Sequence, residues 1–197
     1  GIEQYSVLRS IQAIDRADVV FLVLDSLEMV TAQDTHIAGQ VADAFKGAVI
    51  LVNKWDLAPE LKLDQAECLK YARSRLKFMP YAPVRFVSAL LGQGIEEALD
   101  AALMVSDERH KKIPPRQLHS AVMAAMAEHP PPGKGKRSLR LQRVVQQEIS
   151  PPTFTFYVND PELIHFSYRR YLENRLRDSL GYRWSHLRLQ FKGKGTR

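Results

Sequence analysis

Residues 48–56 are Ala48-Val-Ile-Leu-Val-Asn-Lys-Trp-Asp56, five consecutive apolar residues followed by a mainly polar segment. Apolar residues without polar alternation indicate a β-strand that is buried on both faces, as is typical of a parallel sheet. Asn53-Lys-Trp-Asp56 therefore follows the carboxyl end of a buried strand. Open α/β sheets bind their ligands at that end.

Strands and helices are predicted to alternate on both sides of this segment. The predicted strands are 19–24, 48–52 and 84–87, and the predicted helices are 3–16, 31–47, 64–77 and 95–103. Thr31 with Asp34 resembles a capping box at the start of the second helix, and Gly47 is placed to end it. The alternation predicts an α/β fold, a parallel sheet with helices on both faces, over residues 1–110.

The pattern changes after a polar and Pro-rich stretch at 106–115, which we interpret as a domain boundary. In the domain at 111–197, a helix is expected at 116–128, strands at 138–146 and 153–158, a helix at 168–180 and a strand at 187–191. This α-β-β-α-β order predicts an α+β domain. Gly181 is expected to end its second helix, and residues 130–136 are expected to form a loop.

The composition restricts the class of protein. Apolar residues make up 45% of the 197 residues, which excludes a mainly disordered chain. The longest apolar run, Val19–Leu24, is too short to span a bilayer. Cys68 is the single cysteine, so no intrachain disulfide can form, and a reducing cytoplasm is favoured.

The charge is divided unequally between the two predicted domains. Residues 1–110 carry 11 Lys and Arg against 16 Asp and Glu, whereas residues 111–197 carry 17 against 6. The excess of basic residues in the second domain suggests a polyanionic partner such as nucleic acid. The alternative is an ordinary solvated surface.

The side chains of Asn53-Lys-Trp-Asp56 suit a purine base. The Asp56 carboxylate can accept both the ring N–H and the exocyclic amine of guanine, a pair of donors that adenine does not offer. Asn53 can bond a ring nitrogen and tie neighbouring loops together, and the apolar stem of Lys54 can cover one face of the base. The alternative is a polar turn after a strand that contains an Asp by chance.

A second loop supports the guanine interpretation. Ser88-Ala89-Leu90 follows the next predicted strand and should lie at the same edge of the sheet. Its backbone N–H groups can bond the carbonyl oxygen of guanine, which adenine lacks. In this order and context, the two segments predict a guanine-binding edge.

These motifs carry a family resemblance. Asn53-Lys-Trp-Asp56 and Ser88-Ala-Leu90 resemble the two base-recognition motifs of a Ras-like P-loop GTPase domain. Over nearly the whole chain, the sequence resembles the Der (EngA) family of bacterial GTPases, which have two tandem G domains and a C-terminal KH-like domain. The segments that carry this resemblance are Tyr5–Ser10, Ile14–Asp18, Asn53–Leu57, Pro151–Phe154 and Ser167–Asn174.

The resemblance implies GTP and GDP binding, GTP hydrolysis with Mg²⁺, and a role in assembly of the large ribosomal subunit in the bacterial cytoplasm. The chain would correspond to the second half of the second G domain plus the KH-like domain. It contains no G-x-x-x-x-G-K-[ST], and its one D-x-x-G, Asp178–Gly181, lies in a late helix. We therefore assign no catalytic residue and no metal ligand here. We expect the Mg²⁺ ligands in an N-terminal part and no GTP hydrolysis by this chain alone.

The second domain lacks the G-x-x-G loop by which a KH domain clamps nucleic acid. RNA phosphates are instead expected to meet basic residues, namely Lys134, Lys136, Arg137, Arg140, Arg169, Arg170 and Arg177, with Arg143 and Arg175 as further candidates. The alternative is that some of these arginines pair with Glu148, Glu162 or Glu173.

Two other functions remain open at this stage. One is a non-enzymatic RNA-binding protein that retains only the scaffold of a G domain. The other is an α/β enzyme of another class in which Asn53–Asp56 occurs by chance. The segment Asp25-Ser-Leu-Glu28 also follows a strand, but we expect a turn there rather than a metal site.

Overall fold

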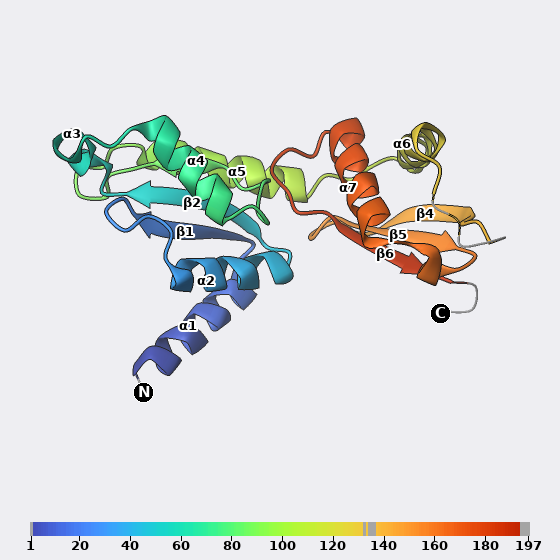
Figure 1. Ribbon diagram of the computed structural model, residues 1–197, viewed down its shortest axis with the longest axis horizontal. Coiled ribbons are helices and arrows are strands. Elements are labelled where there is room, and N and C mark those ends of the chain that lie inside the picture. Colours follow the sequence, from blue (N-terminus) through green and yellow to red (C-terminus); the bar gives the residue numbers. More distant parts are fainter. Residues whose placement is uncertain (1, 132, 134–136, 194–197) are drawn as a thin grey trace. The chain divides into compact units, whose positions relative to one another are not determined.

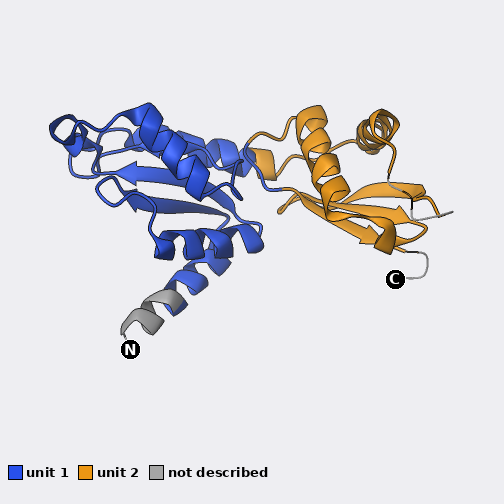
Figure 2. Cartoon of the chain, viewed as in Figure 1, with its two compact units in different colours: residues 1–107, 184–186 blue, residues 108–183, 187–197 orange. Residues whose placement is uncertain are grey.

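The computed structural model describes residues 2–131, 133 and 137–193 (Figure 1). The chain forms two compact units (Figure 2). Unit 1 comprises residues 1–107 with 184–186, and unit 2 comprises residues 108–183 with 187–197. In the described part of the chain, no helix is long and apolar enough to cross a membrane.

Unit 1 contains a parallel three-stranded sheet in the order β1-β2-β3. The strands are β1 (Val19–Asp25), β2 (Gly47–Asn53) and β3 (Val84–Phe86). In register, Asp25 lies beside Asn53, so β1 and β2 end together. Because all three strands run in the same direction, their carboxyl ends meet at one edge of the sheet.

Helices cover both faces of this sheet, which confirms the predicted α/β fold. Helices α1 (Ile2–Arg16), α2 (Ala32–Asp43) and α4 (Gln65–Arg75) pack on one face, through a core that includes Ile14, Val41 and Ala72. Helix α5 packs on the other face, where Ala101 and Val105 contact Val49 and Leu51 of β2. The helices of unit 1 are α1 (Ile2–Arg16), α2 (Ala32–Asp43), α3 (Ala58–Leu61), α4 (Gln65–Arg75) and α5 (Ile95–Arg109), with a 3₁₀ turn at Trp55–Leu57.

Helix α2 begins as predicted but ends earlier. Thr31 and Asp34 form a reciprocal capping box at its N-terminus. The prediction that Gly47 ends this helix is wrong, because α2 ends at Asp43 and Gly47 is the first residue of β2. Phe45 takes the left-handed conformation at the C-terminus, with φ +52°, which is the position that glycine usually fills.

Two apolar side chains of β1 are exposed. Phe21 and Val23 are 39% and 53% exposed. In register, Phe21 and Val23 lie on the same sheet face as Val49 and Leu51 of β2. Helix α5 packs against Val49 and Leu51 but not against Phe21 and Val23. Among the described residues, β1 pairs only with β2, so its other edge carries no strand.

Unit 2 is an α+β unit with the predicted α-β-β-α-β order. Strand β4 pairs antiparallel with β5, and β5 pairs parallel with β6. Its elements are α6 (Pro115–Glu128), β4 (Leu141–Glu148), β5 (Thr153–Val158), a 3₁₀ turn (Pro161–Leu163), α7 (Phe166–Leu180) and β6 (Arg188–Lys192). Gly181 has φ +69° and ends α7, as predicted.

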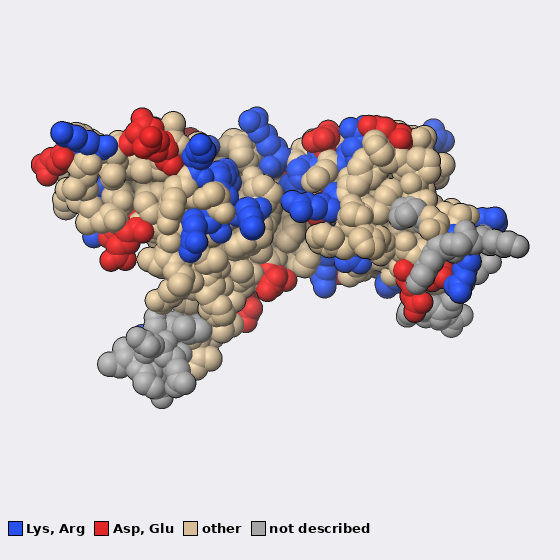
Figure 3. All heavy atoms as spheres, viewed as in Figure 1, with Lys and Arg blue, Asp and Glu red and all other residues tan. Residues whose placement is uncertain are grey.

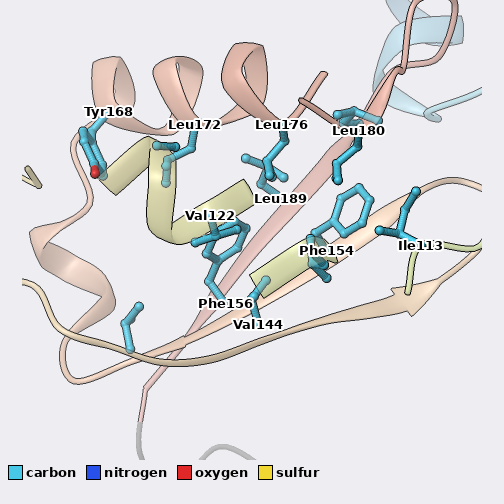
Figure 4. Close-up of a cluster of buried hydrophobic side chains, with 14 of the residues drawn as sticks. Ile113, Val122, Val144, Phe154, Phe156, Tyr168, Leu172, Leu176, Leu180 and Leu189 are labelled. Carbon is cyan, nitrogen blue, oxygen red and sulfur yellow. The ribbon is translucent and has the colours of Figure 1, made fainter. Parts of the chain in front are cut away.

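The core of unit 2 lies between the helices and one face of the sheet. Figure 4 shows Phe154 and Phe156 of β5 between the strands and the two helices. Leu172 and Leu176 of α7 pack against them in the same buried cluster. Tyr182 closes the cluster, and its buried hydroxyl donates a hydrogen bond to the Lys111 carbonyl (3.2 Å). Burial raises the pKa of Tyr182 to about 12.

Phe21→Ser combined with Val23→Thr should reduce self-association of this chain, because exposed apolar side chains on a sheet face favour association with another chain. Light scattering at high protein concentration measures the effect. The control is Leu22→Ala on the opposite, buried face of β1. This variant should lower the free energy of unfolding by about 2–5 kcal/mol. Unchanged self-association of the double variant would contradict the prediction.

Candidate guanine-binding site

Hydrogen bonds join the three loops at the carboxyl edge of the unit 1 sheet. The Ala89 N–H donates to Asn53 Oδ1 (3.0 Å). The Trp55 N–H donates to the Val87 carbonyl and the Ser26 N–H to the Asn53 carbonyl, both at 3.0 Å. The side chain and the backbone of Asn53 therefore connect the loops that follow all three strands, as the sequence predicted for the side chain.

Lys54 is held in a fixed position at this edge. Its backbone is left-handed, with φ +62°, and its carbonyl accepts a hydrogen bond from the Ser26 hydroxyl (3.1 Å). Its Nζ lies 2.6 Å from Asp25 Oδ2. The Lys54 ammonium and the Leu27 N–H together lower the pKa of the Asp25 carboxyl, and the pKa of Lys54 is raised by Asp25. This ion pair directs the lysine stem along the edge.

The Asp25–Glu28 segment is a turn, as predicted. The Leu27 N–H donates to Asp25 Oδ1 (2.9 Å) and the Met29 N–H to the Asp25 carbonyl (2.7 Å). Within the described residues, no group of three or more His, Cys, Asp or Glu could hold a metal ion. Asp25 thus serves the local backbone and Lys54.

Asp56 presents an oxygen that has no hydrogen-bond partner. In the described structure, Asp56 Oδ1 is buried and unpaired. Asp56 also lines an open pocket of about 550 Å³, together with Trp55, Ala58, Pro59, Leu63, Gln65, Leu91 and Gln93. Buried carboxylate oxygens are normally hydrogen-bonded. An unpaired one beside a pocket is therefore a natural acceptor for N–H donors of a ligand.

The loop after β3 is closed by its own hydrogen bonds. Ser88 is buried, and its backbone N–H and carbonyl both pair with Gln93. The Ser88 hydroxyl accepts from the Leu91 N–H (3.2 Å). The Ala89 N–H donates to Asn53. In the segment Ser88–Leu90, this leaves the Leu90 N–H as the backbone amide that takes part in no hydrogen bond among the described residues. Leu90 itself is 84% exposed.

Gly94 allows this loop to close tightly. It has φ +71°, and a Cβ at this position would lie 2.5 Å from the Phe86 carbonyl oxygen. Gly92 has the same φ, but a Cβ there would meet nothing within 4 Å. Of these two positions, Gly94 is the one where both the left-handed conformation and the close approach of the backbone require glycine.

Sequence reasoning proposed Asn53, Lys54 and Asp56 as base-binding residues but missed the residues that position Lys54. Ser26 and Asp25 hold the backbone and the side chain of Lys54. Their place at the end of β1, in register with Asn53, is a signal that could have suggested this role. The roles of the six proposed base-binding residues stay predictions.

The structure separates the basic residues of unit 2 that the sequence proposed for RNA contacts. Lys134 and Lys136 lie outside the described residues. Arg137 pairs with Asp160 (3.2 Å), and Arg177 pairs with Glu173 one helical turn away (2.9 Å). The alternative of pairing with Glu173 is therefore confirmed for Arg177.

The other candidate arginines differ in what they contact. The Arg169 guanidinium lies 5.2 Å from the centroid of the Phe191 ring. Arg175 forms an ion pair with Glu128. Arg140 and Arg170 are exposed, and no described carboxylate pairs with them. In the space-filling view of unit 2, Lys and Arg atoms lie among Asp and Glu atoms (Figure 3).

Comparison with known proteins shows which proteins this chain resembles. Residues 112–192 match the family described as the KH-domain-like region of EngA bacterial GTPase enzymes, C-terminal. The chain is 45% identical over 194 residues to GTPase Der of Thermomicrobium roseum. The resemblance to the Der (EngA) family is confirmed.

Other Der proteins match over the same extent. GTPase Der of Chloroflexus aggregans is 44% identical over 195 residues, and that of Herpetosiphon aurantiacus is 42% identical over 195 residues. Each alignment covers 98% of this chain but 42–43% of the Der relative. The chain thus spans less than half the length of the curated relatives that it matches.

Solved structures resemble the chain only loosely. Era from Aquifex aeolicus, bound to GDP and AlF4⁻, aligns with a TM-score of 0.41 and 17% identity, over 93% of this chain and 68% of Era. The cytosolic domain of T. maritima FeoB in a GDP form aligns with a TM-score of 0.36 and 20% identity, over 57% and 44%.

Gly94→Ala should destabilise unit 1 by about 2–4 kcal/mol, because the new Cβ combines a left-handed backbone with a clash. Gly92→Ala is the matched control with the same φ and free space, and about 1 kcal/mol is expected. Urea denaturation measures both free energies of unfolding. Equal losses would show that the contact with the Phe86 carbonyl is unimportant.

The carboxyl of Asp25 should titrate below its usual pKa of 3.8, since Lys54 and the Leu27 amide favour the charged form. A lowered pKa in the folded state means a contribution to stability that is present at neutral pH and is lost as the pH falls through that pKa. Carboxyl-detected NMR titration measures the midpoint. Lys54→Met should raise the midpoint part of the way back, and an unchanged midpoint would contradict the ion pair.

Proposed function

We propose that this chain is the C-terminal part of a GTP-binding and GTP-hydrolysing factor that acts in the assembly of the large ribosomal subunit in the cytoplasm. The observation that carries the nucleotide assignment is the buried, unpaired Asp56 Oδ1 at the loop edge that Asn53 organises. The Der relatives, which are named GTPases, support the same assignment.

Guanine selectivity follows from the donors and acceptors at this edge. Asp56 accepts the ring N–H and the exocyclic amine of guanine, and the Leu90 N–H is available to the base carbonyl oxygen. Adenine has neither the donor pair nor the carbonyl, so Asp56 would stay unpaired against it. Each charge-assisted hydrogen bond that is lost costs about 1.5–3 kcal/mol, which is enough to exclude adenine.

Asn53 and Lys54 position the base rather than select it. The Asn53 carboxamide holds the loop of Ala89, and its amide nitrogen, which no hydrogen bond among the described residues uses, can face a ring nitrogen of the base. The Lys54 ammonium is anchored by Asp25, so the four methylene groups of the side chain form an apolar surface for one face of the base.

The described residues contain no cluster that fits a metal ion, and the sequence contains no phosphate-binding loop. We therefore assign no hydrolytic step to these residues, and we place the Mg²⁺ ligands in the N-terminal G domains of the longer relatives. Because phosphate contacts supply much of the affinity for nucleotides, this chain alone should bind GTP weakly and hydrolyse none.

Unit 2 is proposed to contact ribosomal RNA. It matches the KH-like family, and residues 111–197 carry 17 Lys and Arg against 6 Asp and Glu. The same charge also favours the second candidate function, a non-enzymatic RNA-binding scaffold with a degenerate G domain. Specific binding of guanosine would distinguish the GTPase proposal from this scaffold.

The test uses amide NMR spectra of the labelled chain with millimolar guanosine or adenosine, because nucleosides bind without a phosphate site. Guanosine should shift the Leu90 amide and adenosine should not. Asp56→Asn should weaken guanosine binding about tenfold or more. Equal shifts with both nucleosides would contradict the guanine site, and phosphate release from GTP by the purified chain would contradict the expected inactivity.

A further inference from the structure

The sheet of unit 2 has one face away from α6 and α7, on which Thr153 and Thr155 of β5 are buried while Tyr157 is half-buried. Side chains alternate along β5, so that Phe154 and Phe156 point into the core under α6 and α7. Thr155 and Tyr157 therefore lie on the opposite face. The strand order β4-β5-β6 places β5 in the centre and leaves β4 and β6 as the two edges.

Three side chains form a row across the accessible end of this face. In register, Arg143 of β4 lies beside Tyr157 of β5, and Tyr157 lies beside Lys192 of β6. The central aromatic residue is thus flanked by two cations. Adjacent strands are about 4.8 Å apart, so the row extends about 10 Å between the Cα atoms of its two ends.

Arg143 and Tyr157 are stacked. The Arg143 guanidinium carbon lies 4.0 Å from the centroid of the Tyr157 ring. Arg143 is exposed, whereas Tyr157 is half-buried, so the guanidinium plane presents its outer side to solvent. Within the described residues, neither Arg143 nor Lys192 has a carboxylate partner.

The rest of the face is less positive. The next row consists of Val145, Thr155 and Gln190, and the Thr155 hydroxyl donates to Gln190 Oε1 (3.2 Å). Glu148 lies beside Thr153, four residues before Tyr157 in β5, in the same row as Arg188. The positive end of the face is therefore the row of Arg143, Tyr157 and Lys192.

We propose that this row binds single-stranded RNA, an inference that rests on the proposed RNA contact of unit 2. Exposed guanidinium planes and aromatic rings are the platforms on which unpaired bases stack. The charges of Arg143 and Lys192 are placed to meet the phosphates on either side of a stacked base. A flat sheet face suits a splayed strand, whereas the bases of a duplex are not accessible for stacking.

This site differs from the contacts that charge alone suggested. Arg137 and Arg177 are already paired with acids, and Arg169 lies near the Phe191 ring beside the core. Arg143 was a candidate for phosphate contact only. The structure places Tyr157 and Lys192 beside Arg143, and the three side chains together form a surface on which a base can stack.

Fluorescence anisotropy with a labelled oligoadenylate of about ten nucleotides tests the proposal. Arg143→Ala and Tyr157→Leu should each weaken binding about tenfold. Arg143→Lys keeps the positive charge but loses the planar guanidinium group. This variant should still bind the oligoadenylate several-fold more weakly than the wild type. Lys192→Ala should mainly reduce the salt dependence of binding.

Arg116→Ala is the matched control, because Arg116 is an exposed arginine of the same unit in helix α6. It should weaken binding by about twofold at most, since one distant surface charge is largely screened. Thermal melts of all variants exclude unfolding as the cause. The oligoadenylate annealed to its complement provides the duplex comparison and should bind more weakly.

The outcomes separate this inference from the proposed function. Three results would overturn the stacking row while leaving RNA binding intact. They are equal losses of RNA affinity for Arg116→Ala and Arg143→Ala, wild-type affinity for Arg143→Lys, or tighter binding of the duplex than of the single strand. Absence of any RNA binding by the wild-type chain would overturn both the row and the proposed RNA contact of unit 2.

Discussion

The hydrogen bond from the Ala89 N–H to Asn53 Oδ1 is the contact on which the candidate site depends. It joins the loops after β2 and β3, while the Asn53 carbonyl accepts from Ser26 after β1. One residue thereby organises three loops that are far apart in the sequence. The parallel direction of the strands makes this possible, because it brings their carboxyl ends to a single edge.

The two units use their sheets differently. In unit 1, helices pack on both faces, and the polar groups of three loops meet at the carboxyl edge of the sheet. In unit 2, helices cover one face only, and polar and aromatic side chains occupy the other. An edge with a few convergent donors and acceptors suits a small molecule, whereas a row of cations and an aromatic ring across a sheet face suits a flexible polymer.

Much of the fold follows from local patterns. The apolar runs of β1 and β2, the capping box at Thr31 and the glycine at 181 each act within one element, and each was predicted correctly. The prediction of where α2 ends was wrong, because Phe45 adopts a left-handed conformation that phenylalanine does not favour. Tertiary packing supports such a conformation, and it leaves no signal in the sequence.

The sequence by itself determined the α/β and α+β classes, the position of Asn53–Asp56 after a buried strand, and the excess of positive charge in the second half. These features depend on periodicity and composition, which are local properties of the chain. Only the tertiary structure decided that Asp25 anchors Lys54, that Asp56 Oδ1 is buried without a partner, and that Arg143 stacks on Tyr157. These three facts depend on side-chain directions and strand register, which exist only once segments distant in sequence have packed together.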